Sequence, residues 1–178
     1  MDSINKQQEE DNFKNLYGVE AVNKIKALVE KTSTCFFCSE IRTGKSFSTR
    51  PMSVQKVDDN ANFWFLSADD SYKMDEIQTD PTVQLLFQGS SYSDFLNIYG
   101  NVTLSKDKEK IKQLWKPILK DWFTEGIDDP RITVIKITPT EGYYWDTKHG
   151  AAVAFAKQIA GAVMGKTMDD SIEGNLHV

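Results

Sequence analysis

Histidine and cysteine, which carry much of protein site chemistry, are scarce in this chain. Its 178 residues include two histidines, His149 and His177, and two cysteines. No second histidine or cysteine pair lies at ligand spacing from either histidine, so the sequence predicts no metal site. It also contains no Walker-type phosphate loop, no dinucleotide fingerprint and no G-x-S-x-G nucleophile motif. Any difficult enzyme chemistry is therefore expected to come from a bound cofactor.

Long apolar runs and an excess of positive charge are also missing. No run approaches membrane-spanning length, and residues 1–12 are polar and unlike a secretory signal. The formal net charge of −5 argues against a general nucleic-acid-binding protein, because such proteins carry a basic footprint. These features predict a cytoplasmic protein that binds neither membranes nor nucleic acid.

The two cysteines, Cys35 and Cys38, form a C-x-x-C pair that could in principle be a redox site. Their surroundings, residues 34–39, are typical of a strand, in which side chains three residues apart point to opposite faces. A local disulfide would therefore be geometrically poor. We favour a structural interpretation, with both cysteines as small buried residues, over a redox pair.

The order of the sequence patterns predicts one mainly β domain with flanking helices. A helical apolar period over residues 19–29 precedes a series of β-forming runs separated by turn residues. The predicted strands are residues 34–41, 47–57, 63–67, 82–88, 95–104, 132–137 and 141–145. Further helices are predicted over residues 71–79, 106–120 (with Pro117 kinking or ending it) and 151–164. Six or seven strands in succession favour an antiparallel barrel, because closure protects the edges of the sheet.

Both ends of the chain lack a clear periodic pattern. Residues 1–17 and 167–178 are therefore predicted to be flexible segments. Residues 18–166 are predicted to form the single domain between them.

A candidate anion site combines residues from two predicted elements. Arg50 lies in the predicted strand 47–57, and Ser71 and Lys73 open the next helix. An arginine, a hydroxyl, a lysine and a helix N-terminus are the parts of a small phosphate site. On the residues alone, an internal salt bridge of Arg50 and a plain N-cap by Ser71 remain open as alternatives.

Several aromatic residues are candidates for the wall of a site for a planar ligand. They are Trp115, Trp122, Phe123 and Trp145. Most such residues are simply part of a core. Trp122 and Phe123 are the stronger candidates, because they precede a loop rich in glycine and aspartate, and exposed aromatic loops are often interface elements.

Six short motifs, taken together in their order and spacing, resemble the general stress protein branch of the pyridoxamine 5′-phosphate oxidase-like flavoproteins. The resemblance extends over residues 19–146. The motifs are Ser48-Thr49-Arg50-Pro51-Met52, Phe63-Trp64-Phe65-Leu66-Ser67, Asp70-Ser71-Tyr72-Lys73-Met74, Leu114-Trp115-Lys116-Pro117, Trp122-Phe123 with Gly126 and Asp128-Asp129-Pro130, and Glu141-Gly142-Tyr143-Tyr144-Trp145-Asp146.

The resemblance implies an FMN-binding split β-barrel of six to seven antiparallel strands, usually a homodimer with the flavin at the subunit interface. Arg50 and Lys73 would contact the FMN phosphate, with Ser71 beside it. Pro51 and Met52 would lie along the flavin ring through main-chain contacts. FAD is the alternative cofactor, and NADH or NADPH is a candidate electron donor. The other residues implied to line the ring and ribityl chain, or to reach them from the interface, are Phe65, Leu66, Ser67, Trp122, Phe123 and Trp145.

The chain departs from the pattern of the branch at residues 45–47, 66–67 and 72, and none of these departures removes an anion-binding group. It lacks the lysine and the C-terminal arginine–histidine features that pyridoxamine phosphate oxidases use on their substrate, so oxidation of vitamin B6 is not expected. Two functions stay open: a flavin-dependent oxidoreductase with an unknown substrate, and a non-catalytic flavin-binding or flavin-buffering stress protein. A cofactor-free split barrel that only dimerises is less favoured, because Arg50, Ser71 and Lys73 are all present.

Overall fold

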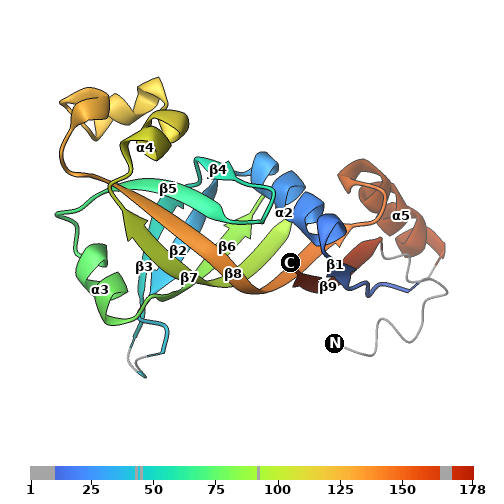
Figure 1. Cartoon of the computed structure of the whole chain (residues 1–178). Helices are drawn as coiled ribbons and strands as arrows, with labels where there is room; N and C mark the ends of the chain where they lie inside the picture. Colours follow the sequence, from blue (N-terminus) through green and yellow to red (C-terminus); the bar gives the residue numbers. More distant parts are fainter. Residues whose placement is uncertain (1–10, 43, 45, 92, 165–169) are drawn as a thin grey trace.

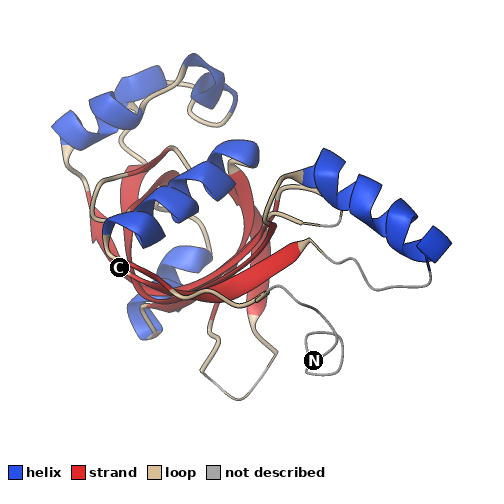
Figure 2. Cartoon of the chain, turned by 90° about the vertical axis from the view of Figure 1, so that its right-hand side faces the viewer, coloured by secondary structure: helices blue, strands red, loops and turns tan. Residues whose placement is uncertain are grey.

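The computed structural model describes residues 11–42, 44, 46–91, 93–164 and 170–178, and its strands form one strongly curved sheet (Figures 1 and 2). The predicted mainly β fold with flanking helices is confirmed. The strands are β1 (Leu16–Tyr17), β2 (Thr34–Ser39), β3 (Ser48–Ser53), β4 (Lys56–Val57), β5 (Phe63–Ala68), β6 (Thr82–Gln88), β7 (Phe95–Ser105), β8 (Ile132–Thr147) and β9 (Ser171–His177). The helices are α2 (Val19–Lys31), α3 (Lys73–Thr79), α4 (Lys108–Leu114) and α5 (Ala151–Met164), with 3-10 turns η1 (Pro117–Asp121) and η2 (Gly126–Asp128).

The chain crosses between two ends of this sheet at the step from β3 to β4. Neighbouring strands follow the order β1-β9-β8-β7-β6-β2-β3, and β5 pairs with both β8 and β4. Val54 and Gln55 make the step. The N–H of Val54 donates to the carbonyl of Ser33 (2.7 Å), and the N–H of Gln55 donates to the carbonyl of Trp64 (2.8 Å). Residues 48–57 thus join the β2 side of the sheet to the β5 side, and the second edge of β3 has no strand partner within the described residues.

The main core fills the inside of the curved sheet, because alternate residues of each strand point inward. Phe37 and Phe65 are fully buried and meet edge-on, with ring centroids 6.0 Å apart. Helix α2 adds Ile25 and Leu28 from one apolar stripe to the same cluster. Phe65 of β5 belongs to this core and Met52 of β3 packs against it, so the core positions these two strands relative to each other.

A smaller apolar cluster lies under α4 and the 3-10 turns, on the side of β5 and β8 that faces away from the main core. Figure 1 shows these helical segments grouped at one end of β5 and β8. The buried members of this smaller cluster are Leu66, Ile111, Leu114, Leu119, Phe123, Ile132 and Val134. The predicted helix 106–120 is divided here. Helix α4 ends at Leu114, and Lys116 stays extended (φ −125°, ψ 144°) because the proline that follows disfavours the helical conformation.

The prediction of a loose tail over residues 167–178 was wrong for residues 171–177, which form β9. This strand pairs antiparallel with the end of β8 and parallel with β1, so β1 and β9 extend the antiparallel set β2–β8. The apolar alternation of β9 is interrupted by Gly174, where a Cβ atom would lie 2.0 Å from the carbonyl oxygen of Lys14. Only glycine allows that approach, and glycine weakened the strand signal in the sequence.

The sheet therefore extends beyond the predicted domain of residues 18–166 at both ends. Of the predicted flexible segment 1–17, residues 1–10 lie outside the described residues. Leu16 and Tyr17 form β1. None of the helices in the described ranges combines the length and the apolar composition that crossing a membrane requires.

The buried carboxylate of Asp170 links the start of β9 to the segment between β8 and β9 that contains α5. Asp170 is 1% exposed, and its oxygens lie 2.7 Å from His149 Nδ1 and 2.7 Å from Lys157 Nζ. The N–H of His149 also donates to it at 3.0 Å. Burial alone would raise the pKa of Asp170, but the hydrogen bonds from Lys157 and His149 outweigh burial and lower the pKa to about 2.

Replacing Asp170 by asparagine should therefore loosen β9 and α5. We expect Asp170→Asn to lower the free energy of unfolding by about 1–3 kcal/mol at neutral pH, because the half-buried Lys157 loses the attraction of this buried charge. Since the folded pKa is depressed, the carboxylate stabilises the fold above its unfolded pKa of about 4, and this stabilisation disappears as the pH falls through about 2. Urea unfolding at several pH values, with the exposed Asp121→Asn as control, measures this. Equal stability of Asp170→Asn and wild type at neutral pH would contradict it.

Candidate functional site

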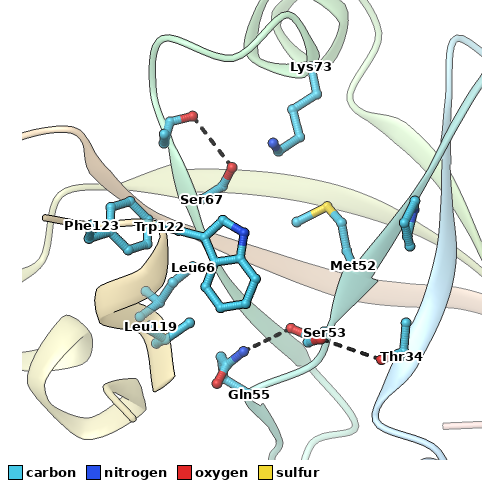
Figure 3. A pocket seen from close by; sticks show the side chains of 12 residues that line it. Thr34, Met52, Ser53, Gln55, Leu66, Ser67, Lys73, Leu119, Trp122 and Phe123 are labelled. Carbon is cyan, nitrogen blue, oxygen red and sulfur yellow. Dashed lines mark hydrogen bonds between the residues drawn. The ribbon is translucent and has the colours of Figure 1, made fainter. Parts of the chain in front are cut away.

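A cavity of about 500 Å³ lies where β3, β5 and α3 meet the aromatic turn that follows η1 (Figure 3). This volume is in the range of sites for small ligands and cofactors. The cavity brings together seven of the predicted site residues: Pro51, Met52, Leu66, Ser67, Lys73, Trp122 and Phe123. The remaining lining residues are Thr34, Ser53, Gln55, Ala68 and Leu119.

Two strands supply facing walls of the cavity. Pro51 and Met52 belong to β3, whose second edge is not covered by another strand in the described part of the chain. Main-chain N–H and C=O groups on such an edge remain available to a ligand, and an edge is also where a strand tolerates proline. Leu66 and Ser67 of β5 form the opposite wall and are both buried.

Lys73 provides the charge of the cavity. It is half-buried, and its side chain extends from α3 toward Met52 and Ser67 (Figure 3). No carboxylate of the described residues lies within 4.0 Å of its Nζ. Burial and, second, the charge of Arg50 lower the pKa of Lys73. A desolvated cation without a close counter-ion is a favourable place for an anionic group.

Arg50, the other predicted phosphate ligand, is not among the residues that line the cavity. Its Nη2 forms an ion pair with Glu76 Oε2 at 2.5 Å and donates to Ser39 Oγ at 3.2 Å. The internal salt bridge that the sequence left open is therefore present. Its partner could not be chosen from the sequence, because many carboxylates are available and only the placement of α3 against β2 and β3 selects Glu76.

The N-cap by Ser71 that the sequence left open is not formed. Helix α3 begins at Lys73, its N-cap is Tyr72, and no side chain caps it. The Ser71 hydroxyl instead donates to the carbonyl of Ala68 at 2.8 Å. It therefore stabilises the turn from β5 into α3 and so helps to place Lys73.

Two further predicted site residues lie away from the cavity. Phe65 is fully buried in the main core, because it points to the side of β5 opposite Leu66. Trp145 stands on β8 next to Tyr143, with ring centroids 4.6 Å apart. Trp115 is half-buried against Phe123, with centroids 6.2 Å apart, and does not line the cavity either.

The sequence missed a neutral polar group at the end of the cavity away from Lys73 (Figure 3). Thr34 and Ser53 are register partners on β2 and β3, and their hydroxyl oxygens are 3.4 Å apart. Gln55 Nε2 donates to the carbonyl of Ser53 at 3.0 Å. Strand alternation after Pro51 could have indicated Ser53, whereas Thr34 required knowledge of the register.

The aromatic wall is held by hydrogen bonds of Arg131. Its Nη2 donates to Asp129 Oδ2 at 2.8 Å and to the carbonyl of Trp122 at 3.5 Å. Trp122 is 64% exposed and its indole lies over the cavity in Figure 3, whereas Phe123, beside it, is buried. The main chain of Trp122 is thus fixed while its indole remains available for contact.

Comparison with known proteins identifies the family. The sequence profile described as "Pyridoxamine 5'-phosphate oxidase like" matches residues 20–169. The chain belongs to the pyridoxamine 5′-phosphate oxidase-like family. Among curated proteins it is similar to Protein bli-3 of Neurospora crassa, with 24% identity over 105 residues. That alignment covers 54% of this chain, which thus spans 50% of the length of that relative.

Solved structures of this family confirm the predicted split-barrel fold. A general stress protein 26 from Jannaschia sp. CCS1 matches with a TM-score of 0.71 and 21% identity, over 90% of this chain and 100% of that chain. A protein described as a pyridoxamine 5′-phosphate oxidase from Listeria innocua is 30% identical, with a TM-score of 0.58 over 69% of this chain and 96% of that chain. A general stress FMN/FAD binding protein from Xanthomonas citri matches with a TM-score of 0.57 and 20% identity, over 68% of this chain and 84% of that chain.

In this member of the pyridoxamine 5′-phosphate oxidase-like family, both cysteines are buried and unbridged, as predicted. Cys35 and Cys38 have register partners Met52 and Thr49, three residues apart on β3, so their side chains point to opposite faces of β2. Burial raises the pKa of Cys35 to about 12. A thiol held protonated in this way is a poor nucleophile, which agrees with a structural role.

Proposed function

We propose that this protein binds a phosphorylated flavin, FMN in the first place, in the cavity between β3, β5 and the Trp122 turn, and acts as a flavin-dependent oxidoreductase. The observation that carries the proposal is Lys73, a half-buried cation with no carboxylate of the described residues within 4.0 Å, at one end of an aromatic-lined cavity. The FMN/FAD binding relative from Xanthomonas citri and the family assignment support the same ligand class.

The lining residues fit the phosphate, the polar edge of the ring system and the less polar part of the ring system in such a ligand. Lys73 would hold the phosphate through charge-assisted hydrogen bonds. The open edge of β3 and the neutral group of Thr34, Ser53 and Gln55 would meet the polar edge of the ring system. The apolar side chains of Leu66, Leu119 and Trp122 would cover its less polar part and keep water away. When bound, the flavin supplies the electron-transfer chemistry.

A non-catalytic flavin-binding or flavin-buffering role is the second candidate. It is favoured by one observation: Lys73 is the only ionisable residue among the twelve that line the cavity. Anaerobic addition of NADH or NADPH to the flavin-loaded protein separates the two. Bleaching of the flavin absorbance at a catalytic rate supports the oxidoreductase, and binding without bleaching supports the carrier.

We further propose that the protein forms a homodimer through the outer face of β2, β3 and β6. Phe36 pairs in register with Pro51 and Leu86, so these three side chains share one face of the sheet. Phe36 is 55% exposed, and Pro51 and Leu86 are also exposed. A contiguous exposed apolar patch is typical of an interface. Because Pro51 also lines the cavity, a second subunit on this patch would lie beside the flavin.

The phosphate contact predicts a ligand-specific loss in Lys73→Met. We expect the binding free energy of FMN to this variant to be weaker by about 1.5–3 kcal/mol, because a charge-assisted contact is removed. This corresponds to an affinity that is roughly ten- to a hundredfold lower. Riboflavin, which lacks the phosphate, should bind wild type and variant almost equally. Fluorescence titration with both flavins, using the exposed Lys56→Met as control, measures the difference. Equal losses for FMN and riboflavin would show that Lys73 acts structurally.

The proposed interface predicts that Phe36→Glu is monomeric. Two buried carboxylates facing each other across a symmetric apolar interface would oppose association. Sedimentation velocity on wild type, Phe36→Glu and the control Phe155→Glu, which replaces another exposed phenylalanine, measures the oligomeric state. A wild type that sediments as a monomer, or a Phe36→Glu that remains a dimer, would rule out this face.

A further inference from the structure

Lys73 and Glu76 are neighbours on one side of helix α3. They lie three residues apart, a spacing at which side chains of opposite charge on a helix can pair. Burial alone would raise the pKa of Glu76, but hydrogen bonds outweigh burial and lower it, so Glu76 is ionised at neutral pH. The donors of these hydrogen bonds are Ser39, Arg50 and Ser48. Lys73 therefore has a possible counter-ion on its own helix, yet the two side chains form no ion pair within 4.0 Å.

Glu76 is instead committed to groups on β3 and β2. Glu76 Oε2 pairs with Arg50 Nη2 at 2.5 Å and accepts from the hydroxyl of the fully buried Ser39, also at 2.5 Å. Arg50 Nη2 donates to the same hydroxyl oxygen at 3.2 Å, so the three groups contact one another. The side chains of Arg50 and Glu76 are 23% and 17% exposed, so solvent screens this pair only in part.

Arg50 acts on Lys73 from outside the cavity. It is not among the residues that line the cavity, whereas Lys73 is. After burial, the charge of Arg50 is the second cause that lowers the pKa of Lys73, while Glu76 and Asp70 act in the opposite direction. Two cations thus lie near one carboxylate, and the one that holds it is the cation that does not line the cavity.

We propose that Arg50 is a positioning residue for the bound phosphate: by holding Glu76, it keeps this carboxylate from pairing with Lys73 and cancelling its charge. The proposal rests on the flavin-binding function above. It differs from the direct contact with the phosphate that the family resemblance implies for Arg50. Without Arg50, the partly buried carboxylate of Glu76 would lose its counter-charge, and Lys73 on the same helix would be its replacement.

The formal charges of Lys73, Arg50 and Glu76 give each variant its own expected affinity. Wild type has a net positive charge of one at this end of the cavity. Arg50→Gln removes that net charge, whereas the double variant Arg50→Gln/Glu76→Gln restores it and leaves Lys73 unpaired. The FMN phosphate carries close to two negative charges above its second pKa, about 6, so its binding depends on this net charge. The double variant should therefore bind FMN far better than Arg50→Gln does.

The experiment is a double-mutant cycle measured with FMN and with riboflavin. Wild type, both single variants, the double variant and the control Asp75→Asn, an exposed acid on the same helix, are titrated by flavin fluorescence. The readout is the ratio of the FMN affinity to the riboflavin affinity, because a distorted cavity weakens both ligands alike. Circular dichroism checks folding, and the double variant still tests the proposal if Arg50→Gln alone does not fold.

In Arg50→Gln the ratio should fall about tenfold, because the charge-assisted contact of Lys73 with the phosphate is lost. In the double variant it should return to within about threefold of wild type, and in Glu76→Gln alone it should not fall. A double variant as weak for FMN as Arg50→Gln would overturn the proposal and show that Arg50 itself binds the phosphate. An unchanged ratio in Arg50→Gln would overturn it too. If FMN did not bind wild type, the proposed function itself would fail and this inference with it.

Discussion

The half-buried charge of Lys73 is the constraint on which the site depends. Removing an ammonium group from water costs free energy unless an opposite charge lies close to it. The nearby carboxylate of Glu76 is paired with Arg50 instead. An anionic ligand at this end of the cavity would stabilise the charged form of Lys73. The apolar and aromatic walls would then favour a ligand whose phosphate is attached to a flat ring system.

The topology of the sheet creates the space that this ligand needs. At Val54 and Gln55 the chain leaves the β2 side of the sheet for the β5 side, so β3 and the end of β5 at residues 66–68 line the cavity without pairing with each other. The turn held by Arg131 covers this cavity with Trp122 and Phe123. The cavity thus lies between the β2 side and the β5 side of the sheet. The main-chain groups of β3 form its polar edge.

The sequence predicted most of the residues that line the cavity, but few of the hydrogen bonds and ion pairs around it. Pro51, Met52, Ser67 and Lys73 belong to motifs whose order indicated the family, and all of them line the cavity. The pairing of Arg50 with Glu76 depends on how α3 sits against β2 and β3, which local patterns do not encode. The contribution of Thr34 depends on strand register in the same way. Strand β9 was missed because Gly174, which the close approach of Lys14 requires, hides its alternation.

The most direct test of this account is the pKa of Lys73 itself, measured by NMR titration of selectively labelled lysine side chains with and without FMN. In the free protein we expect this pKa to lie below the ordinary value of 10.5 for lysine, because burial and the charge of Arg50 lower it. FMN should raise this pKa, whereas riboflavin should not, because only the phosphate favours the charged form of Lys73. An unshifted pKa in the free protein, or the same response to both flavins, would contradict the proposal that Lys73 is a desolvated cation that binds the flavin phosphate.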